Sequence, residues 1–171
     1  MKLNLCCGGK HHDGYINIDI RMGAGDIQWD CSQPLPYSSD SIDEILIEAG
    51  FEHFYRYQQL DILRDWHKKL KVGGKAKILW LPDFEVAISQ YQKGEFDNMR
   101  GDCKGIDIAW GIILGAAGDE PQLHKDIFTK ATILHLLKQV FNTVEVDYMC
   151  NKPESVEWPN NKYGLCVEAT K

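Results

Sequence analysis

Residues 3–20 read LNLCCGGKHHDGYINIDI, two short apolar runs joined by a turn that contains two glycines. Apolar residues alternate in the first run, and the second run leads to an acid, Asp19. This order of strand, tight turn, strand and carboxylate is typical of a nucleotide-type binding site. Gly8 and Gly9 allow backbone N–H groups to approach a ligand closely, because glycine has no Cβ and accepts positive φ. An acid at the end of the second strand can accept hydrogen bonds from both ribose hydroxyls.

Composition narrows the class of protein. The chain has 171 residues, 44% of them hydrophobic, so we expect one domain with a substantial core. The formal net charge is −6 with scattered acids, which argues against general nucleic-acid or anionic-membrane binding, since affinity for phosphates needs clustered Lys and Arg. No apolar run approaches the ~20 residues that span a bilayer. The opening MKLNLCC is too short, and the residues after it too polar, for a signal peptide, so we expect a cytoplasmic protein.

The six cysteines are dispersed, and no two of them form a Cys-x-x-Cys pair. In a cytoplasmic protein this pattern indicates reduced thiols. Zinc held by Cys6 and Cys7 together with His11 and His12 stays open as an alternative. Adjacent cysteines chelate a metal poorly, however, and nothing else in the sequence requires one, so we expect no metal.

Hydrophobic periodicity predicts seven strands and three helices. Gly73 and Gly74 are expected to end the first helix, Pro82 to end the strand after it, and Thr129 to cap the last helix. Between the second and third expected helices, the glycine-rich segment 94–124 is predicted to form an irregular or partly helical insertion. The expected strands are 3–5, 15–20, 26–29, 41–48, 76–81, 144–148 and 165–169, and the expected helices are 56–71, 84–93 and 130–140.

This order of elements predicts the fold class. Parallel strands separated by helices form an α/β fold with a doubly wound, mostly parallel, Rossmann-like sheet, and the last two strands add an antiparallel C-terminal hairpin. The connection between the first two strands is too short to hold a full crossover helix.

Six blocks of sequence then follow one another over about residues 3–150. In order they resemble the motifs of the small class I S-adenosylmethionine (SAM)-dependent methyltransferases, in a type 11-like form with a shortened first helix. The blocks correspond to the glycine-rich motif, the ribose motif, the adenine-side loop with the fourth strand, the "LEH" signature, the glycine turn with the fifth strand, and the block before the last helix. They read LNLCCGG (3–9), INIDI (16–20), DIQWDCSQPLPYSSDSIDEI (26–45), FEHF (51–54), WHKKLKVGGKAKILWLPD (66–83) and HKDIFTKATILHLLKQVF (124–141).

The resemblance implies SAM as cofactor and S-adenosylhomocysteine (SAH) as product. It places the backbone of Cys7 and Gly8 beside the cofactor and assigns Asp19 to the ribose hydroxyls. The family usually has glycine where Cys6 stands. A thiol there would narrow the groove beside the methionine end of the cofactor.

Three further residues belong to the implied cofactor site. Asp30 follows the third strand and could accept from the adenine amino group, while the backbone N–H of Cys31 could donate to the ring. Asp30 could instead cap the following loop. Glu48, at the exit of the fourth strand, lines the pocket in one interpretation and is a solvated strand-end acid in the other.

The acceptor would enter beside residues 48–54, 82–85 and an insertion at about 94–125. His53 is the first candidate for a general base, because the pKa of histidine is close to neutrality. A purely structural hydrogen bond is the competing interpretation of His53. Asp83 is a second candidate base, and His124 with Lys125 could hold the acceptor.

The function that this implies is methyl transfer from SAM to an oxygen or nitrogen acceptor on a small molecule or glycan. Such an in-line displacement needs mainly positioning, with a base where the acceptor must lose a proton. A catalytically inactive SAM-binding or scaffold domain with the same fold stays open. A nicotinamide-dependent dehydrogenase is disfavoured by the absence of G-x-G-x-x-G.

Overall fold

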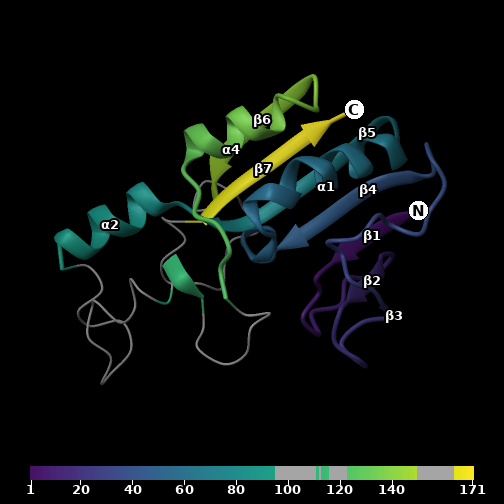
Figure 1. Ribbon diagram of the computed structural model, residues 1–171, viewed down its shortest axis with the longest axis horizontal. Helices are drawn as coiled ribbons and strands as arrows, with labels where there is room; N and C mark the ends of the chain where they lie inside the picture. The colour runs from purple at the N-terminus through teal and green to yellow at the C-terminus, as the bar shows by residue number, and fades with distance from the viewer. Residues whose placement is uncertain (95–110, 112, 116–122, 150–163) are drawn as a thin grey trace.

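A computed structural model describes residues 1–94, 111, 113–115, 123–149 and 164–171 (Figure 1). The insertion expected at about 94–125 therefore lies mostly outside the described residues, and its extent stays a prediction.

Within these ranges the strands form one seven-stranded sheet in the order β3-β2-β1-β4-β5-β7-β6. Neighbouring strands are parallel from β3 to β5, whereas β7 runs antiparallel to both β5 and β6. This arrangement confirms the predicted α/β, mostly parallel, Rossmann-like sheet with an antiparallel C-terminal pair. The strands are β1 (Lys2–Leu5), β2 (Ile16–Asp19), β3 (Ile27–Gln28), β4 (Ile42–Glu48), β5 (Leu70–Pro82), β6 (Thr143–Tyr148) and β7 (Gly164–Thr170).

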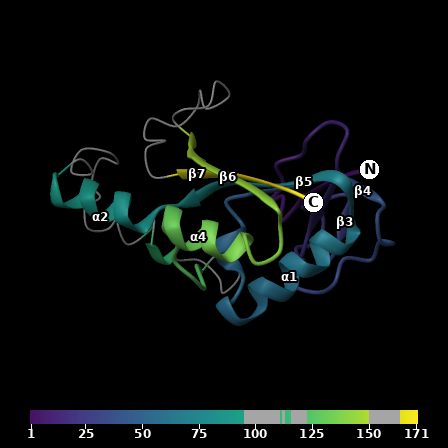
Figure 2. The same ribbon diagram turned by 90° about the horizontal axis from the view of Figure 1, so that it is seen from above.

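The described helices are η1 (Phe51–His53, a 3₁₀ turn), α1 (Arg56–Lys69), α2 (Phe84–Gln92) and α4 (Lys130–Leu137). Helices α1 and α4 lie on the same side of the sheet (Figures 1 and 2). The connection from β1 to β2 consists of turns without a helix, as its length predicted.

Two helix ends test the turn signals of the sequence. Thr129 caps α4 as predicted: its side chain and that of Thr132 each accept from the other residue's backbone N–H. The prediction for Gly73 and Gly74 is wrong, because α1 already ends at Lys69 and the next residue begins β5. The pairing of β4 with β5 shifts register over these glycines, and Gly73 has φ +78°. They therefore serve a bulge rather than a helix end.

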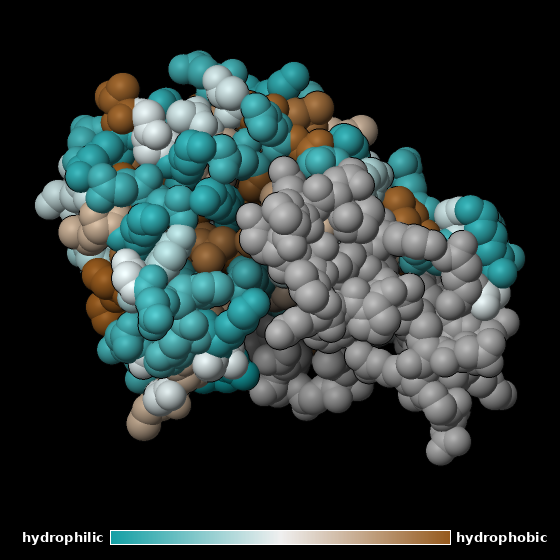
Figure 3. Space-filling view, turned by 180° about the vertical axis from the view of Figure 1, so that it is seen from behind, coloured by the Kyte–Doolittle hydropathy of each residue, from teal (hydrophilic) through white to brown (hydrophobic). Residues whose placement is uncertain are grey.

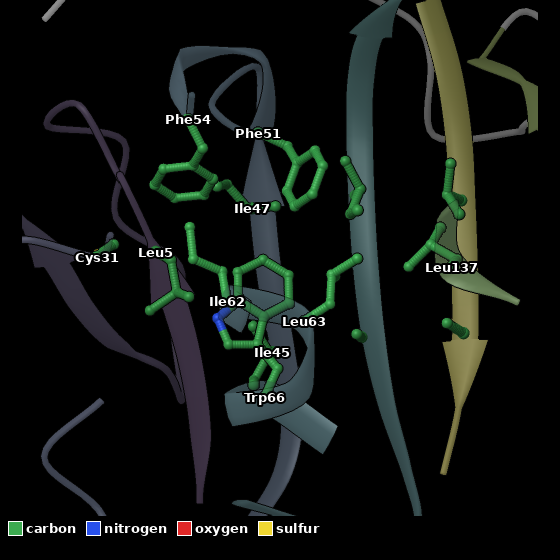
Figure 4. Close-up of a cluster of buried hydrophobic side chains, with 14 of the residues drawn as sticks. Leu5, Cys31, Ile45, Ile47, Phe51, Phe54, Ile62, Leu63, Trp66 and Leu137 are labelled. Carbon is green, nitrogen blue, oxygen red and sulfur yellow. The ribbon is translucent and has the colours of Figure 1, made fainter. Parts of the chain in front are cut away.

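The core lies between α1 and the centre of the sheet (Figure 4). Trp66 and Leu63 of α1 pack with Ile45 and Ile47 of β4 and with Leu5 of β1, and all five are almost fully buried. Each apolar side chain removed from water in this way contributes roughly 1.5–3 kcal/mol.

An aromatic cluster continues this core toward the carboxyl end of β4. The ring of Phe51 lies 5.7 Å from that of Phe54, 5.9 Å from Trp66 and 5.8 Å from Phe128 (centroid to centroid). Aromatic pairs at such distances add about 0.5–1.5 kcal/mol each beyond area burial. The short turn η1 is thereby held onto the core by its first residue.

The described part of the surface in Figure 3 is mainly hydrophilic, with hydrophobic residues in small separate patches. Among the described helices, none combines the length and the apolar character needed to cross a membrane.

Candidate active site

The carboxyl ends of β1, β2 and β4 meet at one edge of the sheet (Figure 1). From β1 the chain proceeds outward to β2 and β3, and then returns to β4 on the other side of β1. The topological switch point therefore lies between the carboxyl ends of β1 and β4, and open α/β sheets bind their ligands at such points.

The turn after β1 has an unusual backbone. Cys6 has φ +52°, Gly8 has φ +58° and Gly9 has φ +87°. Positive φ is readily adopted by glycine but is strained for a residue with a Cβ. The family that the sequence resembles usually has glycine at the position of Cys6, and glycine is the residue that a positive φ favours. The turn is tied to β2 because the Cys7 N–H donates to the Ile18 carbonyl at 3.1 Å.

Asp19 lies directly beside this turn and is only 3% exposed. One carboxylate oxygen accepts from the Gly8 N–H at 2.8 Å, and the other accepts from the backbone N–H and Nε of Arg21 at 2.9 and 3.0 Å. Burial alone would raise the pKa of Asp19, but the hydrogen bonds from Arg21 and Gly8 outweigh it and lower the pKa. Asp19 is thus a buried, ionised acceptor at the end of β2, as its predicted role requires.

Arg21 is a residue that the sequence analysis missed, although it stands only two positions after Asp19. Its guanidinium also lies over Gly8: a Cβ built on Gly8 would stand 3.2 Å from Arg21 Nη2. A carboxylate has about four lone-pair positions, of which these contacts use three. A ligand at Asp19 therefore shares the carboxylate with Arg21 or displaces its side chain.

Of the thiols in this region, Cys7 and Cys31 are buried and Cys6 is half-buried. The neighbouring Cys31 thiol, together with burial, raises the pKa of Cys6 well above its usual value. The Cys7 thiol donates to the Ala24 carbonyl at 3.2 Å. Asp30 accepts from the Ser32 N–H at 2.9 Å, the loop-capping contact that competes with its adenine role.

Glu48 connects β4 to the turn between β1 and β2. One of its oxygens lies 2.9 Å from Lys10 Nζ and 3.0 Å from His12 Nε2. Burial would raise the pKa of Glu48, but these two partners lower it. Lys10 and His12 were not predicted as partners of Glu48, although both stand in the opening stretch.

These contacts engage the side chains of the suggested zinc set. His12 is engaged by Glu48, and His11 Nε2 lies 3.0 Å from the Ala24 carbonyl. The Cys7 thiol contacts the same Ala24 carbonyl as His11. Among the described residues, Cys6, Cys7, His11 and His12 are not a group that could hold a metal ion.

Glu52 and His53 stand on η1, immediately beyond β4. Glu52 is 2% exposed, and burial raises its pKa to about 8. Its Oε1 lies 3.8 Å from His124 Nε2. The rings of His53 and His124 meet edge to face with centroids 5.0 Å apart. The structure thus brings the predicted base and a predicted acceptor residue together, around a buried acid that the sequence analysis did not select.

The His53 imidazole contacts the Leu123 carbonyl through Nδ1 at 3.1 Å. Burial and the positive charge of Lys125 lower the pKa of His53, against the opposing effect of that hydrogen bond. The ring is therefore neutral at neutral pH, with one nitrogen able to accept a proton.

Residues 123–128 are docked onto η1 and α1. The Lys125 N–H donates to the Glu52 carbonyl at 2.8 Å, and Lys125 Nζ lies 5.4 Å from the centre of the Tyr55 ring. Asp126 forms an ion pair with Arg56, which donates from Nε and Nη2, and accepts from Gln59 Nε2 at 3.2 Å. These contacts hold His124 beside His53.

A small pocket opens next to this group, with about 230 Å³ of empty space, part of it open to solvent. Apolar side chains with a few polar groups among them are the usual lining of a small-molecule site. The lining residues are Glu52, Pro82, Phe84, Ile113, His124, Asp126, Ile127 and Phe128.

Asp83 follows β5 as predicted, but its contacts are those of a structural residue. It is fully buried, and one oxygen accepts from the N–H groups of Glu85 and Val86 at 3.0 and 3.3 Å, which caps α2. The other oxygen accepts from the Tyr148 hydroxyl at 3.2 Å. Both carboxylate oxygens are thus engaged, so we assign Asp83 a structural role rather than that of a base.

Comparison with known proteins identifies the fold. No protein-family model and no curated protein matches the sequence. A SAM-dependent methyltransferase from Thermotoga maritima is similar in structure, with TM-score 0.63 and 11% identity over 99% of this chain and 81% of the other. One from Archaeoglobus fulgidus gives TM-score 0.62 and 14% identity over 99% and 85%. The chain has the class I SAM-dependent methyltransferase fold, as the resemblance predicted.

Proposed function

We propose that this protein is a SAM-dependent methyltransferase that acts on an oxygen or nitrogen acceptor of a small molecule or glycan. The observation that carries the proposal is the buried, ionised carboxylate of Asp19 hydrogen-bonded to the Gly8 turn, at the switch point of this fold. The free thiols of Cys6, Cys7 and Cys31 fit a reducing compartment, in support of the cytoplasmic location expected above.

The residues at the cofactor side fit SAM. Asp19 keeps one lone-pair position for a ribose hydroxyl, and a cofactor could approach the Gly8 backbone once the Arg21 side chain moves aside. Asp30 and the Cys31 N–H would bind the adenine, and Glu48 would line the pocket. When bound, SAM supplies the electrophilic methyl carbon and a good leaving group.

On the acceptor side, His53 is the proposed general base. Donation from Nδ1 to the Leu123 carbonyl fixes the ring and leaves its other nitrogen as the proton acceptor. The pocket beside His124 would hold a small acceptor, and Lys125 would contact its polar groups. Positioning accounts for most of the expected rate, with the base adding to it.

The first test is calorimetric titration of the purified protein with SAM and with SAH, followed by an SAH-release assay over a panel of hydroxyl and amine acceptors. His53→Ala should lower turnover by about 10²–10⁴-fold and leave SAM affinity nearly unchanged. His135→Ala, an exposed histidine on α4, is the matched control. Full turnover in His53→Ala would remove His53 as the base, and the absence of SAM and SAH binding would overturn the cofactor class.

A catalytically inactive SAM-binding or scaffold domain is the second candidate. Two observations favour it: a residue with a side chain at the φ +52° position of the turn, and the Arg21 guanidinium over Gly8. SAM binding without turnover on any acceptor of the panel would select this function.

A further inference from the structure

Three metal-binding side chains converge at the acceptor side. One ligand atom each of Glu52, His53 and His124 can be chosen so that all three lie within 4.8 Å of one another. Two of them come from η1, and the third, His124, lies 71 positions after His53, on the segment docked against η1. Among the described residues, this is the group of histidine, cysteine and acidic side chains that could hold an ion.

The buried acid supplies an independent observation. Glu52 is 2% exposed and its Oε2 has no hydrogen-bond partner among the described residues. Leaving a buried polar atom unpaired costs about 1–3 kcal/mol. The backbone carbonyl of the same residue is satisfied by the Lys125 N–H, so the gap is confined to the carboxylate. A bound cation would fill it.

Two imidazoles and one carboxylate are a common donor set for Zn²⁺ in sites that keep an open coordination position. Ligand atoms about 2.1 Å from a tetrahedral zinc stand about 3.4 Å from one another. Glu52 Oε1 and His124 Nε2 are 3.8 Å apart, and the three ligand atoms lie within 4.8 Å of one another, so the group must contract slightly around a bound ion.

The surroundings of His53 also suit a ligand. Histidines that bind metals usually donate their second ring N–H to a carboxylate or a backbone carbonyl, which fixes the tautomer and the ring orientation. His53 Nδ1 makes such a contact with the Leu123 carbonyl at 3.1 Å.

We propose that Glu52, His53 and His124 bind one divalent transition-metal ion, with Zn²⁺ as the best-suited ion, and leave a coordination position open to the adjacent pocket. In the loaded protein His53 is a ligand rather than the base, and a hydroxyl bound to the metal becomes more acidic. This proposal replaces the expectation from sequence that no metal binds. Metal binding itself does not depend on methyl transfer.

The test is calorimetric titration of chelator-treated, full-length protein with Zn²⁺. We expect one equivalent to bind, and Glu52→Gln and His124→Ala each to weaken it by at least about tenfold, since even residues behind the ligands change affinity by 10–100-fold. His135→Ala and Asp61→Ala, at exposed positions, should bind Zn²⁺ like the unmodified protein.

Co²⁺ used as a second probe distinguishes this site from the cysteines, because thiolate ligands give an intense charge-transfer absorption that nitrogen and oxygen ligands lack. Absence of binding, a thiolate band, or unchanged Zn²⁺ affinity in both variants would overturn the proposal. The same variants are also titrated with SAM, and their SAM affinity should stay within about twofold of that of the unmodified protein. A failure of the metal proposal is thereby distinguished from a failure of the proposed methyltransferase function. If Glu52→Gln does not fold, His124→Ala decides: Zn²⁺ should raise the thermal midpoint of the unmodified protein but not of this variant.

Discussion

The two sides of the candidate site are built from different kinds of contact. On the cofactor side, the Gly8–Asp19 hydrogen bond joins residues 11 positions apart, and that from Arg21 to Asp19 joins residues two apart. On the acceptor side, the contacts from His53 to Leu123 and from Arg56 to Asp126 each join residues 70 apart. One side follows from a short stretch of chain, whereas the other exists only after distant segments meet.

This difference has an energetic counterpart. Hydrogen bonds to a charged group, worth about 1.5–3 kcal/mol each, hold the cofactor side together. The acceptor side depends on burial of the aromatic cluster around Phe51, because η1 has no side-chain cap of its own. Substitutions on the acceptor side should therefore lower mainly the free energy of unfolding. Substitutions on the cofactor side should change mainly the affinity for SAM.

The largest effect is expected from Phe51→Ala. Removal of this fully buried ring from the cluster should lower the free energy of unfolding by about 3–5 kcal/mol, measured by urea denaturation. Tyr57→Ala on α1, where the side chain is 75% exposed, is the control and should change it by less than about 0.5 kcal/mol. A loss below about 1 kcal/mol in Phe51→Ala would show that η1 is not anchored through the core.

Asp19→Ala should have the next largest effect, on affinity. SAM binding should weaken at least tenfold, about 1.4 kcal/mol, because the ribose loses its acceptor and the Gly8 turn loses its tie to β2. The SAM affinity is measured by calorimetric titration. The control is Asp61→Ala, because the Asp61 carboxylate is 80% exposed. Unchanged affinity would place the cofactor elsewhere and end the contrast between the two sides.

Cys6→Gly should have the smallest effect. Glycine relieves the strain of a Cβ at φ +52°, but the thiol that it removes is small and half-buried in the protein. SAM affinity should therefore rise by no more than about threefold, roughly 0.6 kcal/mol. Cys166→Ala on β7 is the control. A clear loss of affinity would mean that the thiol supports the cofactor side rather than narrowing it.

Much of the fold was readable from sequence because its signals are local. Alternating apolar residues marked the strands, Thr129 marked the start of α4, and the short β1–β2 connection excluded a helix. The prediction failed at Gly73 and Gly74, since a glycine pair after a helix is compatible with either a helix end or a bulge. Only the pairing of β5 with β4 distinguishes the two.

The site divides in the same way. The sequence by itself placed Asp19 and the Gly8 turn at the ends of two successive strands, because the turn and the acid each follow a local apolar run. The hydrogen bond between them was found only in the structure. The tertiary structure alone decided that Asp83 caps a helix, that Arg21 lies over Gly8, and that Glu52 faces two histidines. The physical reason is burial: the state of a carboxylate depends on which distant groups surround it, and sequence spacing does not carry that information.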